Sequence, residues 1–300
     1  MSHNMYPKIG LALGSGGAKG LAHIGVIKVL EKNNIPIDYI AGSSIGALLG
    51  AYYATYKDTQ KLEDLILNFN RRKGFELFDF TIKGGLFKGI KAERFIAEIL
   101  EGAKFETLKI PFAAVATDIN TAESIMLSEG SIVKAVRASV AVPAFYQPLL
   151  YKNRLLADGG LSNPIPVDVL TTMGADITIA VNLDSFYLEK TLKEMPALSR
   201  VPVHSINILR HTLAQQSAKT ADIIISPQDT LHVGILGWRF FFDNERAKQI
   251  IKEGENVAEA ALPQIQKSIQ EFRYNHTRRG KFFALFRRLR KKGRPISFSS

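Results

Sequence analysis

The feature that most constrains this chain is a pair of consecutive segments near its start, in each of which a short apolar run meets a glycine-containing turn and then a helical pattern. The two segments occupy residues 9–13, 14–20 and 22–33, and then residues 39–41, 42–46 and 47–56. Short apolar runs indicate buried strands, and apolar residues at helical spacing indicate amphipathic helices. Consecutive strand–helix units predict parallel strands, because each helix returns the chain to the same end of the sheet.

The same alternation continues through the rest of the chain. We predict further strands over residues 110–117, 153–157, 177–183 and 223–226, and further helices over 131–139, 167–173 and 245–270, the last interrupted by Pro263. Residues 185–205 are loop-like and are expected to form a crossover connection. We therefore expect an α/β fold with a mostly parallel central sheet flanked by helices. A hydrophobic content of 46% excludes a wholly disordered chain.

Positive charge is concentrated at the C-terminus. The net charge of the 300 residues is +11, of which residues 271–300 supply +9 with ten Lys/Arg and one acidic residue. Residues 1–270 therefore carry only +2. No linker divides them, so we expect one domain over 1–270 and a basic tail over 271–300. A basic tail indicates an anionic partner, either a membrane or a nucleic acid.

Other features favour a cytoplasmic protein. Residues 1–8 are polar and the apolar stretch after them breaks at Gly14, so no secretory signal is expected. The chain has no cysteine, which excludes disulfides, thiolate metal sites and a cysteine nucleophile. Residues 39–56 carry no charge and approach the length of a membrane span. Serines, tyrosines and glycines dilute their apolar content, and we interpret them as a buried strand, turn and helix.

The glycine loop at residues 14–20 (GSGGAKG) admits three interpretations. It fails the dinucleotide fingerprint because Lys19 takes the place of the last glycine. It fails the P-loop pattern because its lysine precedes the glycine and no Ser or Thr follows. As an anion-binding turn it would converge backbone N–H groups on one concavity at a helix N-terminus. The plain alternative is a structural turn.

The second turn, residues 42–46 (GSSIG), matches G-x-S-x-G with Ser44 at its centre. In this motif Gly42 and Gly46 let a strand turn sharply into a helix and leave the serine exposed in a strained elbow. The strand before and the helix after are the context that a nucleophilic serine needs. The alternative is a tight turn packed on the sheet. Ser43 is a rival hydroxyl at a flanking position.

A serine nucleophile needs a base. Three histidines fall late enough for the order of a Ser-His-Asp triad, but no distinctive turn surrounds them: His204, His211 and His232. Asp158 is the better candidate, because it follows an apolar run and precedes two glycines that allow close backbone approach. A plain Asp-Gly turn is the alternative. His23, at the start of the first helix, is expected to brace the glycine loop.

Together these motifs resemble the patatin-like phospholipase family, and the chain looks most like its bacterial members. The resemblance spans residues 8–265 and rests on residues 14–20, 42–46 and 158–160 (DGG), with support from 138–143 (ASVAVP) and 163–166 (NPIP). It implies a patatin-like three-layer fold. Lys19 stands where many bacterial members have arginine, which keeps the charge and makes Lys19 a candidate contact for an anionic headgroup. Residues 271–300 lie outside the family pattern.

The resemblance implies a Ser-Asp dyad that uses no histidine, metal or cofactor. Ser44 would attack an ester carbonyl and Asp158 would take its proton, with burial raising the carboxyl pKa above its reference of about 4. Backbone N–H groups of Gly16, Gly17 and Ala18 would hold the oxyanion, and one such donor is worth about 3–4 kcal/mol.

Three aromatic-rich stretches are candidate lipid contacts. Residues 75–87 hold four phenylalanines and residues 238–242 hold four aromatics, and ordinary core is the alternative for both. In the tail, apolar side chains recur at helical spacing and basic residues surround them, which is typical of an interfacial segment. The candidate membrane contacts are Phe282, Phe286, Arg287 and Arg288. We expect the tail, rather than the body, to bind anionic membranes. A disordered tail or a nucleic-acid contact is the alternative.

The sequence thus predicts a cytoplasmic serine acyl hydrolase of phospholipase or lysophospholipase type, at or near the inner membrane face. One alternative is a non-catalytic lipid-binding or regulatory protein on the same fold, against which the intact Ser44 and Asp158 argue. Another is a Ser-His-Asp carboxylesterase, which would need one indispensable histidine. Nucleic acid is not the expected partner, and the sequence indicates no oligomeric state.

Overall fold

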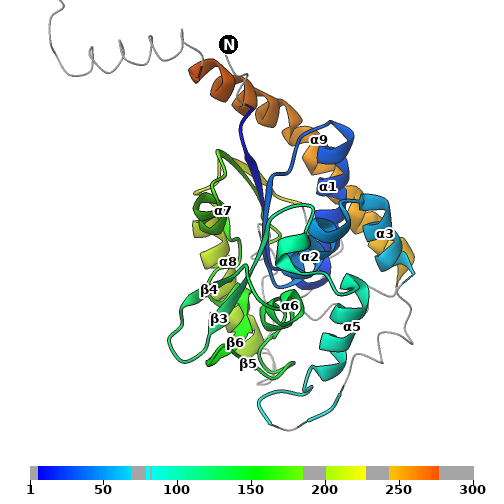
Figure 1. Cartoon of the computed structure of the whole chain (residues 1–300), viewed down its shortest axis with the longest axis vertical. Coiled ribbons are helices and arrows are strands. Elements are labelled where there is room, and N and C mark those ends of the chain that lie inside the picture. The colour runs from blue at the N-terminus through cyan, green and yellow to red at the C-terminus, as the bar shows by residue number, and fades with distance from the viewer. Residues whose placement is uncertain (1–5, 69–78, 82, 185–200, 228–242, 277–300) are drawn as a thin grey trace, which may run out of the picture. The chain divides into compact units, whose positions relative to one another are not determined.

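The computed structural model describes residues 6–68, 79–81, 83–184, 201–227 and 243–276 (Figure 1). The chain divides into two compact units: Lys8–Ala261, and Met1–Pro7 together with Leu262–Ser300. Helix α9 (Asn244–Asn275) begins in the larger unit and supplies most of the described residues of the smaller one. It continues through Pro263, so the expected interruption is wrong. A proline removes its own N–H from the helix and its ring crowds the carbonyl of residue i−4, so a long helix continues past it at a local cost.

The larger unit is built on a mixed, mostly parallel sheet of eight strands. Their bounds are β1 (Ile9–Leu13), β2 (Tyr39–Ser43), β3 (Phe112–Asp118), β4 (Ser124–Leu127), β5 (Leu149–Tyr151), β6 (Arg154–Asp158), β7 (Ile177–Val181) and β8 (Ile223–Ile225). The order is β5-β6-β3-β2-β1-β7-β8, with β4 paired to β3 outside this path. Strands β3, β2, β1, β7 and β8 run parallel, and β4, β5 and β6 pair antiparallel.

Two strands meet end to end along one edge of β3. Strand β2 pairs with the first half of β3 and ends with Ser43 opposite Val115. Strand β6 approaches from the other direction and ends with Asp158 opposite Ala116. Strand β4 pairs with β3 alongside both of them, so it takes the other edge and leaves β2 and β6 on the same one. The C-terminal ends of β2 and β6 therefore face each other.

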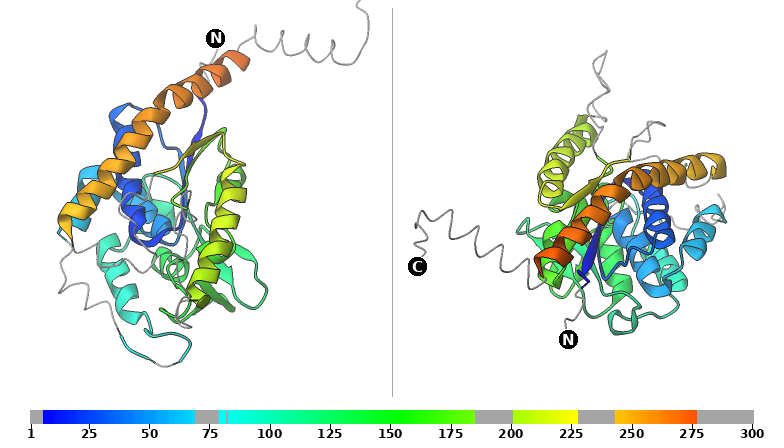
Figure 2. Two further views of the ribbon diagram at one scale, coloured as in Figure 1. Left: turned by 180° about the vertical axis from the view of Figure 1, so that it is seen from behind. Right: turned by 90° about the horizontal axis from the view of Figure 1, so that it is seen from above.

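Helices cover both faces of the sheet (Figures 1 and 2). Helices α7 and α8 lie on one face, and α1, α2, α3, α5 and α6 lie on the other. Their bounds are α1 (Ala22–Lys32), α2 (Ile45–Tyr56), α3 (Thr59–Leu67), α5 (Ile90–Leu100), α6 (Ile132–Ser139), α7 (Val167–Met173) and α8 (Val201–Ala218), with 3-10 turns η1 (Gly17–Leu21), η2 (Phe105–Thr107) and η3 (Gly159–Leu161). The expected α/β class is confirmed.

The sequence-based elements differ from the structure mainly where pairing is antiparallel or helices are short. Strand β1 and helix α7 have the predicted bounds. Residues 201–205, expected as loop, begin helix α8, whereas residues 185–200 lie outside the described part. Helices α3 and α5 and strands β4 and β5 were not predicted. Helix α3 has a local signal in Asp58, whose carboxylate accepts from the N–H of Lys61 at 3.0 Å as an N-cap.

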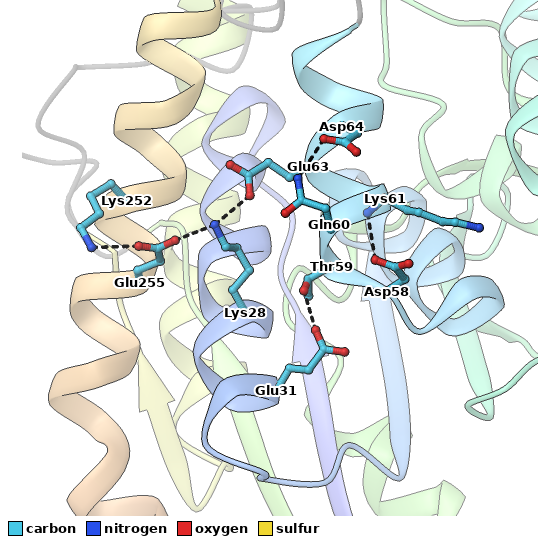
Figure 3. Close-up of polar contacts among 10 residues, drawn as sticks. All are labelled: Lys28, Glu31, Asp58, Thr59, Gln60, Lys61, Glu63, Asp64, Lys252 and Glu255. Atoms are coloured by element: carbon cyan, nitrogen blue, oxygen red, sulfur yellow. Dashed lines mark hydrogen bonds and ion pairs between the residues drawn. The ribbon is translucent and has the colours of Figure 1, made fainter.

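Helix α1 crosses α9 with almost no space between the backbones. A Cβ on Gly25 would lie 2.0 Å from the carbonyl oxygen of Ile251, and one on Gly254 would lie 2.1 Å from that of Ala22. Ion pairs flank this crossing: Lys28 on α1 contacts Glu63 at 2.7 Å and Glu255 at 2.9 Å (Figure 3). Paired glycines therefore set how closely α9 approaches the α1 side of the sheet.

We predict that Gly25→Leu lowers the free energy of unfolding by more than about 2 kcal/mol, because the added side chain has to push two backbones apart. Thermal and urea unfolding measure the loss. Lys32→Leu, at an exposed position of the same helix, is the control and should change stability by less than about 0.5 kcal/mol. Equal stability of the two variants would contradict the close crossing.

Candidate active site

The second glycine turn holds Ser44 in a strained backbone conformation between β2 and α2. Ser44 has φ 55° and ψ −122°, and a non-glycine residue keeps such a positive φ only where its surroundings enforce it. Its N–H donates to Oγ of Ser139 at 2.9 Å, and that hydroxyl donates in turn to the carbonyl of Val115 at 2.5 Å. The buried Ser139 hydroxyl thus ties the turn to β3.

The two glycines of the turn are required by close backbone approach. A Cβ on Gly42 would lie 2.4 Å from the carbonyl oxygen of Gly46. A Cβ on Gly46 would lie 2.0 Å from the carbonyl oxygen of Leu13, at the end of β1. Any other residue at either position would force the turn away from the sheet. The turn is therefore compact enough to present Ser44 beside the ends of β1 and β2.

Asp158 meets Ser44 at the junction of β2 and β6. The Ser44 hydroxyl donates to Oδ2 of Asp158 at 2.6 Å. The other carboxylate oxygen accepts from the N–H of Gly160 at 2.8 Å. The Asp158 backbone is held on both sides, since its N–H donates to Ala141 at 3.0 Å and its carbonyl accepts from the Thr117 hydroxyl at 2.8 Å. The carboxylate is therefore fixed in position and pointed at one hydroxyl.

Burial dominates the electrostatics of this pair. Asp158 is 6% exposed, and the loss of solvation raises the pKa of its carboxyl to about 6. The hydrogen bonds from Ser44 and Gly160 and the positive charge of Arg210 act in the opposite direction and lower the pKa. The carboxyl remains mostly ionised at neutral pH, yet it is a stronger base than an exposed aspartate.

Arg210 comes from α8, which lies with α7 on one face of the sheet. Its guanidinium makes a two-pronged contact with Asp184, with Nε at 2.8 Å and the terminal nitrogen at 2.7 Å from the carboxylate oxygens. Both side chains are buried, so the pair has a fixed geometry. The positive charge of Arg210 acts on Asp158 through space rather than by contact.

The first glycine loop borders the same pair. A Cβ on Gly160 would lie 3.0 Å from Oγ of Ser15, and one on Gly20 would lie 2.4 Å from the Ile45 side chain, next to Ser44. Gly16 is the N-cap of the 3-10 turn η1, and Gly17 and Ala18 begin it, where the first N–H groups have no partner inside the helix. The loop thus brings backbone donors to the neighbourhood of Ser44.

His23 supports this loop through a hydrogen bond to its first residue. Its Nε2 lies 2.8 Å from the carbonyl oxygen of Gly14, which makes Nε2–H the donor. Burial lowers the pKa of His23 to about 4, so the ring is neutral near pH 7. The sequence-based expectation that His23 braces the glycine loop agrees with this contact. Lys19 lies 3.5 Å from the carbonyl oxygen of Leu183.

No histidine of the described residues hydrogen-bonds to Ser44 or Asp158. His211 contacts the backbone carbonyl of Asp184 at 2.5 Å, and His232 and the side chain of His204 lie outside the described part. Within that part no group of three or more His, Asp or Glu side chains is placed to hold a metal ion.

Sequence reasoning missed the supporting residues. Ser139 lies 95 residues from Ser44. No pattern marks Arg210 as a charge that acts on Asp158, or Asp184 as the partner of Arg210. Ser139 stands inside the ASVAVP run, which was noted without a role for its hydroxyl. Long-range contacts of this kind leave no periodic signal in a single sequence.

Several predicted lipid contacts lie outside the described residues, namely residues 238–242 and the tail residues Phe282, Phe286, Arg287 and Arg288. Of the stretch 75–87, Phe87 is buried whereas Phe80 is 80% exposed. No helix in the described ranges is both long and apolar enough to span a bilayer. Residues 39–56, noted above as an uncharged stretch, form β2, the Ser44 turn and α2.

Comparison with known proteins gives a consistent set of matches. A family model described as patatin-like phospholipase matches residues 11–171, which include both glycine turns and Asp158. An uncharacterized NTE family protein of Mycobacterium tuberculosis is 38% identical over 179 residues, which cover 59% of this chain and 49% of that protein. Human patatin-like phospholipase domain-containing protein 6 is 33% identical over 183 residues, covering 59% of this chain and 13% of the relative.

The chain therefore matches about half the length of the mycobacterial relatives and a small part of the human one. Among solved structures, VipD from Legionella pneumophila superposes with a TM-score of 0.53 at 13% identity, over 86% of this chain and 67% of VipD. At that identity the likeness is one of fold.

Proposed function

Because the chain belongs to the patatin-like phospholipase family, we propose that it is a serine acyl hydrolase that cleaves fatty-acyl esters of lipids with Ser44 and Asp158. The observation that carries the proposal is the 2.6 Å hydrogen bond from the Ser44 hydroxyl to the buried Asp158 carboxylate. A strained nucleophile turn and an aligned base are the two parts that acyl transfer needs.

In the first step the Ser44 oxygen attacks the ester carbonyl carbon while its proton passes to Oδ2 of Asp158. The tetrahedral oxyanion is held by the N–H groups of Gly16, Gly17 and Ala18, each worth about 3–4 kcal/mol. The intermediate then collapses, and the alcohol leaves with the proton from Asp158. The product is an acyl-enzyme on Ser44.

In the second step water attacks the acyl carbonyl and Asp158 takes its proton. The second tetrahedral intermediate releases the fatty acid and returns the proton to Ser44. Because the pKa of Asp158 is raised to about 6, the carboxylate accepts a proton more readily than a solvated aspartate, and it remains ionised between turnovers at neutral pH.

We propose a phospholipid or lysophospholipid as the substrate class, met at the inner face of the membrane. Lys19 in the glycine loop is the candidate contact for an anionic headgroup. The basic tail supplies long-range attraction to that surface, since residues 271–300 carry +9 and an anionic leaflet contributes about 1 kcal/mol per nearby basic residue.

The main alternative is a lipid-binding or regulatory protein that keeps the fold without catalysis. Labelling of Ser44 by a fluorophosphonate probe separates the two, because a purely binding protein has no need of an activated serine. A Ser-His-Asp esterase is the second alternative. It requires that one of six single histidine-to-alanine variants lose activity about a thousandfold.

We predict that Ser44→Ala and Asp158→Asn each abolish hydrolysis of a soluble short-chain ester, while thermal unfolding stays nearly unchanged. Combining them should cost little more than either alone, because residues of one catalytic unit are not additive. Thr172→Ala, an exposed hydroxyl on α7, is the matched control and should keep full activity. Near-full activity of either single variant would end the dyad assignment.

We predict that kcat/KM falls as pH drops through about 6, because Asp158 has to be deprotonated to accept the Ser44 proton. Replacing Arg210 and Asp184 together by Gln and Asn removes the cation that lowers this pKa, so the acid limb should move to higher pH. Arg210→Lys keeps the charge and should shift it less. Chromatography of the released acid measures the rates, and a profile that ignores Arg210 would contradict this electrostatic role.

We predict that the tail contributes to binding of anionic vesicles. In the full-length protein, Phe282→Ser with Phe286→Ser should weaken co-sedimentation even at high salt, because that part of the affinity is hydrophobic. Arg287→Gln with Arg288→Gln should weaken it only at low salt, because charge attraction is screened. Unchanged sedimentation of both variants on anionic vesicles would leave the tail without a membrane role.

A further inference from the structure

Three large apolar side chains are exposed on the segment that leads into α5. Phe80 is 80% exposed, Leu86 52% and Ile90 51%. Figure 1 draws this segment as the loop beyond the N-terminal end of α5. We call residues 79–81 and 83–91 the apolar loop. These apolar side chains remain in contact with water in the folded protein. A group of exposed apolar side chains marks a surface that binds another protein or a membrane.

The apolar loop is held by hydrogen bonds that join its own residues. The carboxylate of Asp79 accepts from the N–H groups of Gly89 and Ile90 at 2.8 Å each, which caps α5. The N–H of Thr81 donates to Leu86 at 2.9 Å and closes the loop on itself. Phe80 and Leu86 are therefore carried by an ordered turn.

A buried guanidinium fastens the same loop to the body. Arg137, only 2% exposed, donates to the carbonyls of Gly89 at 3.0 Å, Lys88 at 2.8 Å and Gln147 at 3.0 Å. Gly89 has φ 82°, and a Cβ there would collide with the guanidinium. Two of these carbonyls, Gly89 and Lys88, belong to the loop, and displacing the loop would leave the buried charge without them, which is costly.

The charge around the apolar residues is positive. Lys83, Lys88 and Lys91 are exposed on the apolar loop, and none of them is part of an ion pair among the described residues. The one carboxylate on the loop, Asp79, faces inward onto the N-terminus of α5. Apolar tips ringed by lysines match the headgroup and acyl layers of an anionic bilayer.

The apolar loop is also continuous with the candidate active site. The N–H of Leu86 donates to Ala144 at 3.0 Å, and Ala141, three residues earlier, accepts from the N–H of Asp158 at 3.0 Å. The same segment leads into β5, where Leu150 is 72% exposed and pairs with Leu155 of β6. One short stretch of backbone thus connects the exposed apolar residues to the carboxylate.

We propose that the apolar loop is a docking surface for an anionic lipid bilayer, which sets the catalytic pair at the membrane surface. This rests on the proposed lipid hydrolase function and adds a second membrane contact to the tail, whose own binding stays a prediction. In this proposal the tail contributes charge attraction and its own apolar contact, and the apolar loop inserts beside the site.

The test measures binding separately from catalysis. Full-length Ser44→Ala protein is sedimented with vesicles of phosphatidylcholine, alone or mixed with phosphatidylglycerol, with and without Phe282→Ser and Phe286→Ser in the tail. Phe80→Ser with Leu86→Ser should weaken partitioning on the order of tenfold in both tail backgrounds. Lys83→Gln with Lys88→Gln should weaken it only on anionic vesicles at low salt. Ile224→Ser, 41% exposed at the opposite edge of the sheet, is the control.

The absence of cysteine allows a second readout that does not depend on how well the serine variant folds. Leu86→Cys, labelled with an environment-sensitive fluorophore, should shift to the blue on anionic vesicles, whereas labelled Ile224→Cys should not. Equal spectra at the two sites, or equal partitioning of the loop and Ile224 variants, would overturn the proposal. So would a dimer in sedimentation velocity that Phe80→Ser with Leu86→Ser dissociates, since a second copy would then cover the surface. Hydrolysis of a soluble ester by the Ser44-intact protein is tested independently of all these outcomes.

Discussion

The end-to-end meeting of β2 and β6 on one edge of β3 is the constraint on which the rest of the structure depends. Parallel strands alone would place the ends of β1, β2 and β7 in one row, and these strands end in Leu13, Ser43 and Val181. The parallel strand β3 does end in an acid, Asp118, but it runs three residues past Val115, the partner of Ser43. The antiparallel β6 reverses direction and delivers Asp158 opposite Ala116, one position beyond the point where β2 ends at Ser43. The 2.6 Å contact between Ser44 and Asp158 follows from that register, and the strained turn and Ser139 fix its final geometry.

Burial gives this contact its chemistry, and the surrounding residues moderate it. Loss of solvent raises the carboxyl pKa, while two hydrogen bonds and a fixed cation on α8 lower it. The balance leaves a carboxylate that is ionised at neutral pH and still basic. His23 shows the same physics with the opposite sign, since burial keeps that ring neutral and makes it a support for the glycine loop.

The parts of the fold that local pattern determines could be predicted, and the parts set by distant pairing could not. Strand β1 and the Ser44 turn follow from short apolar runs and glycine spacing, and the Asp-Gly-Gly turn was recognisable as a strand end. Nothing local announces that β6 runs antiparallel, because register is a property of pairs of strands. The first residues of helix α8, 201–205, were expected as loop and the rest of the helix was not predicted, because its apolar residues are not segregated to one face. Ser139 and Arg210 act over long sequence separations, and their roles became visible only with the structure.

The register at β3 also limits how this architecture tolerates change in length. A strand has a side-chain period of two, so one residue inserted in β6 between Arg154 and Asp158 would turn the carboxylate to the other face of the sheet. One residue inserted in the turn between β3 and β4, at 120–122, would leave the pairing of β3 with β4 and β6 in register. Changes in loop length are therefore tolerated on the edge of β3 that pairs with β4. On the edge that pairs with β2 and β6, the number of residues in the strand has to be conserved.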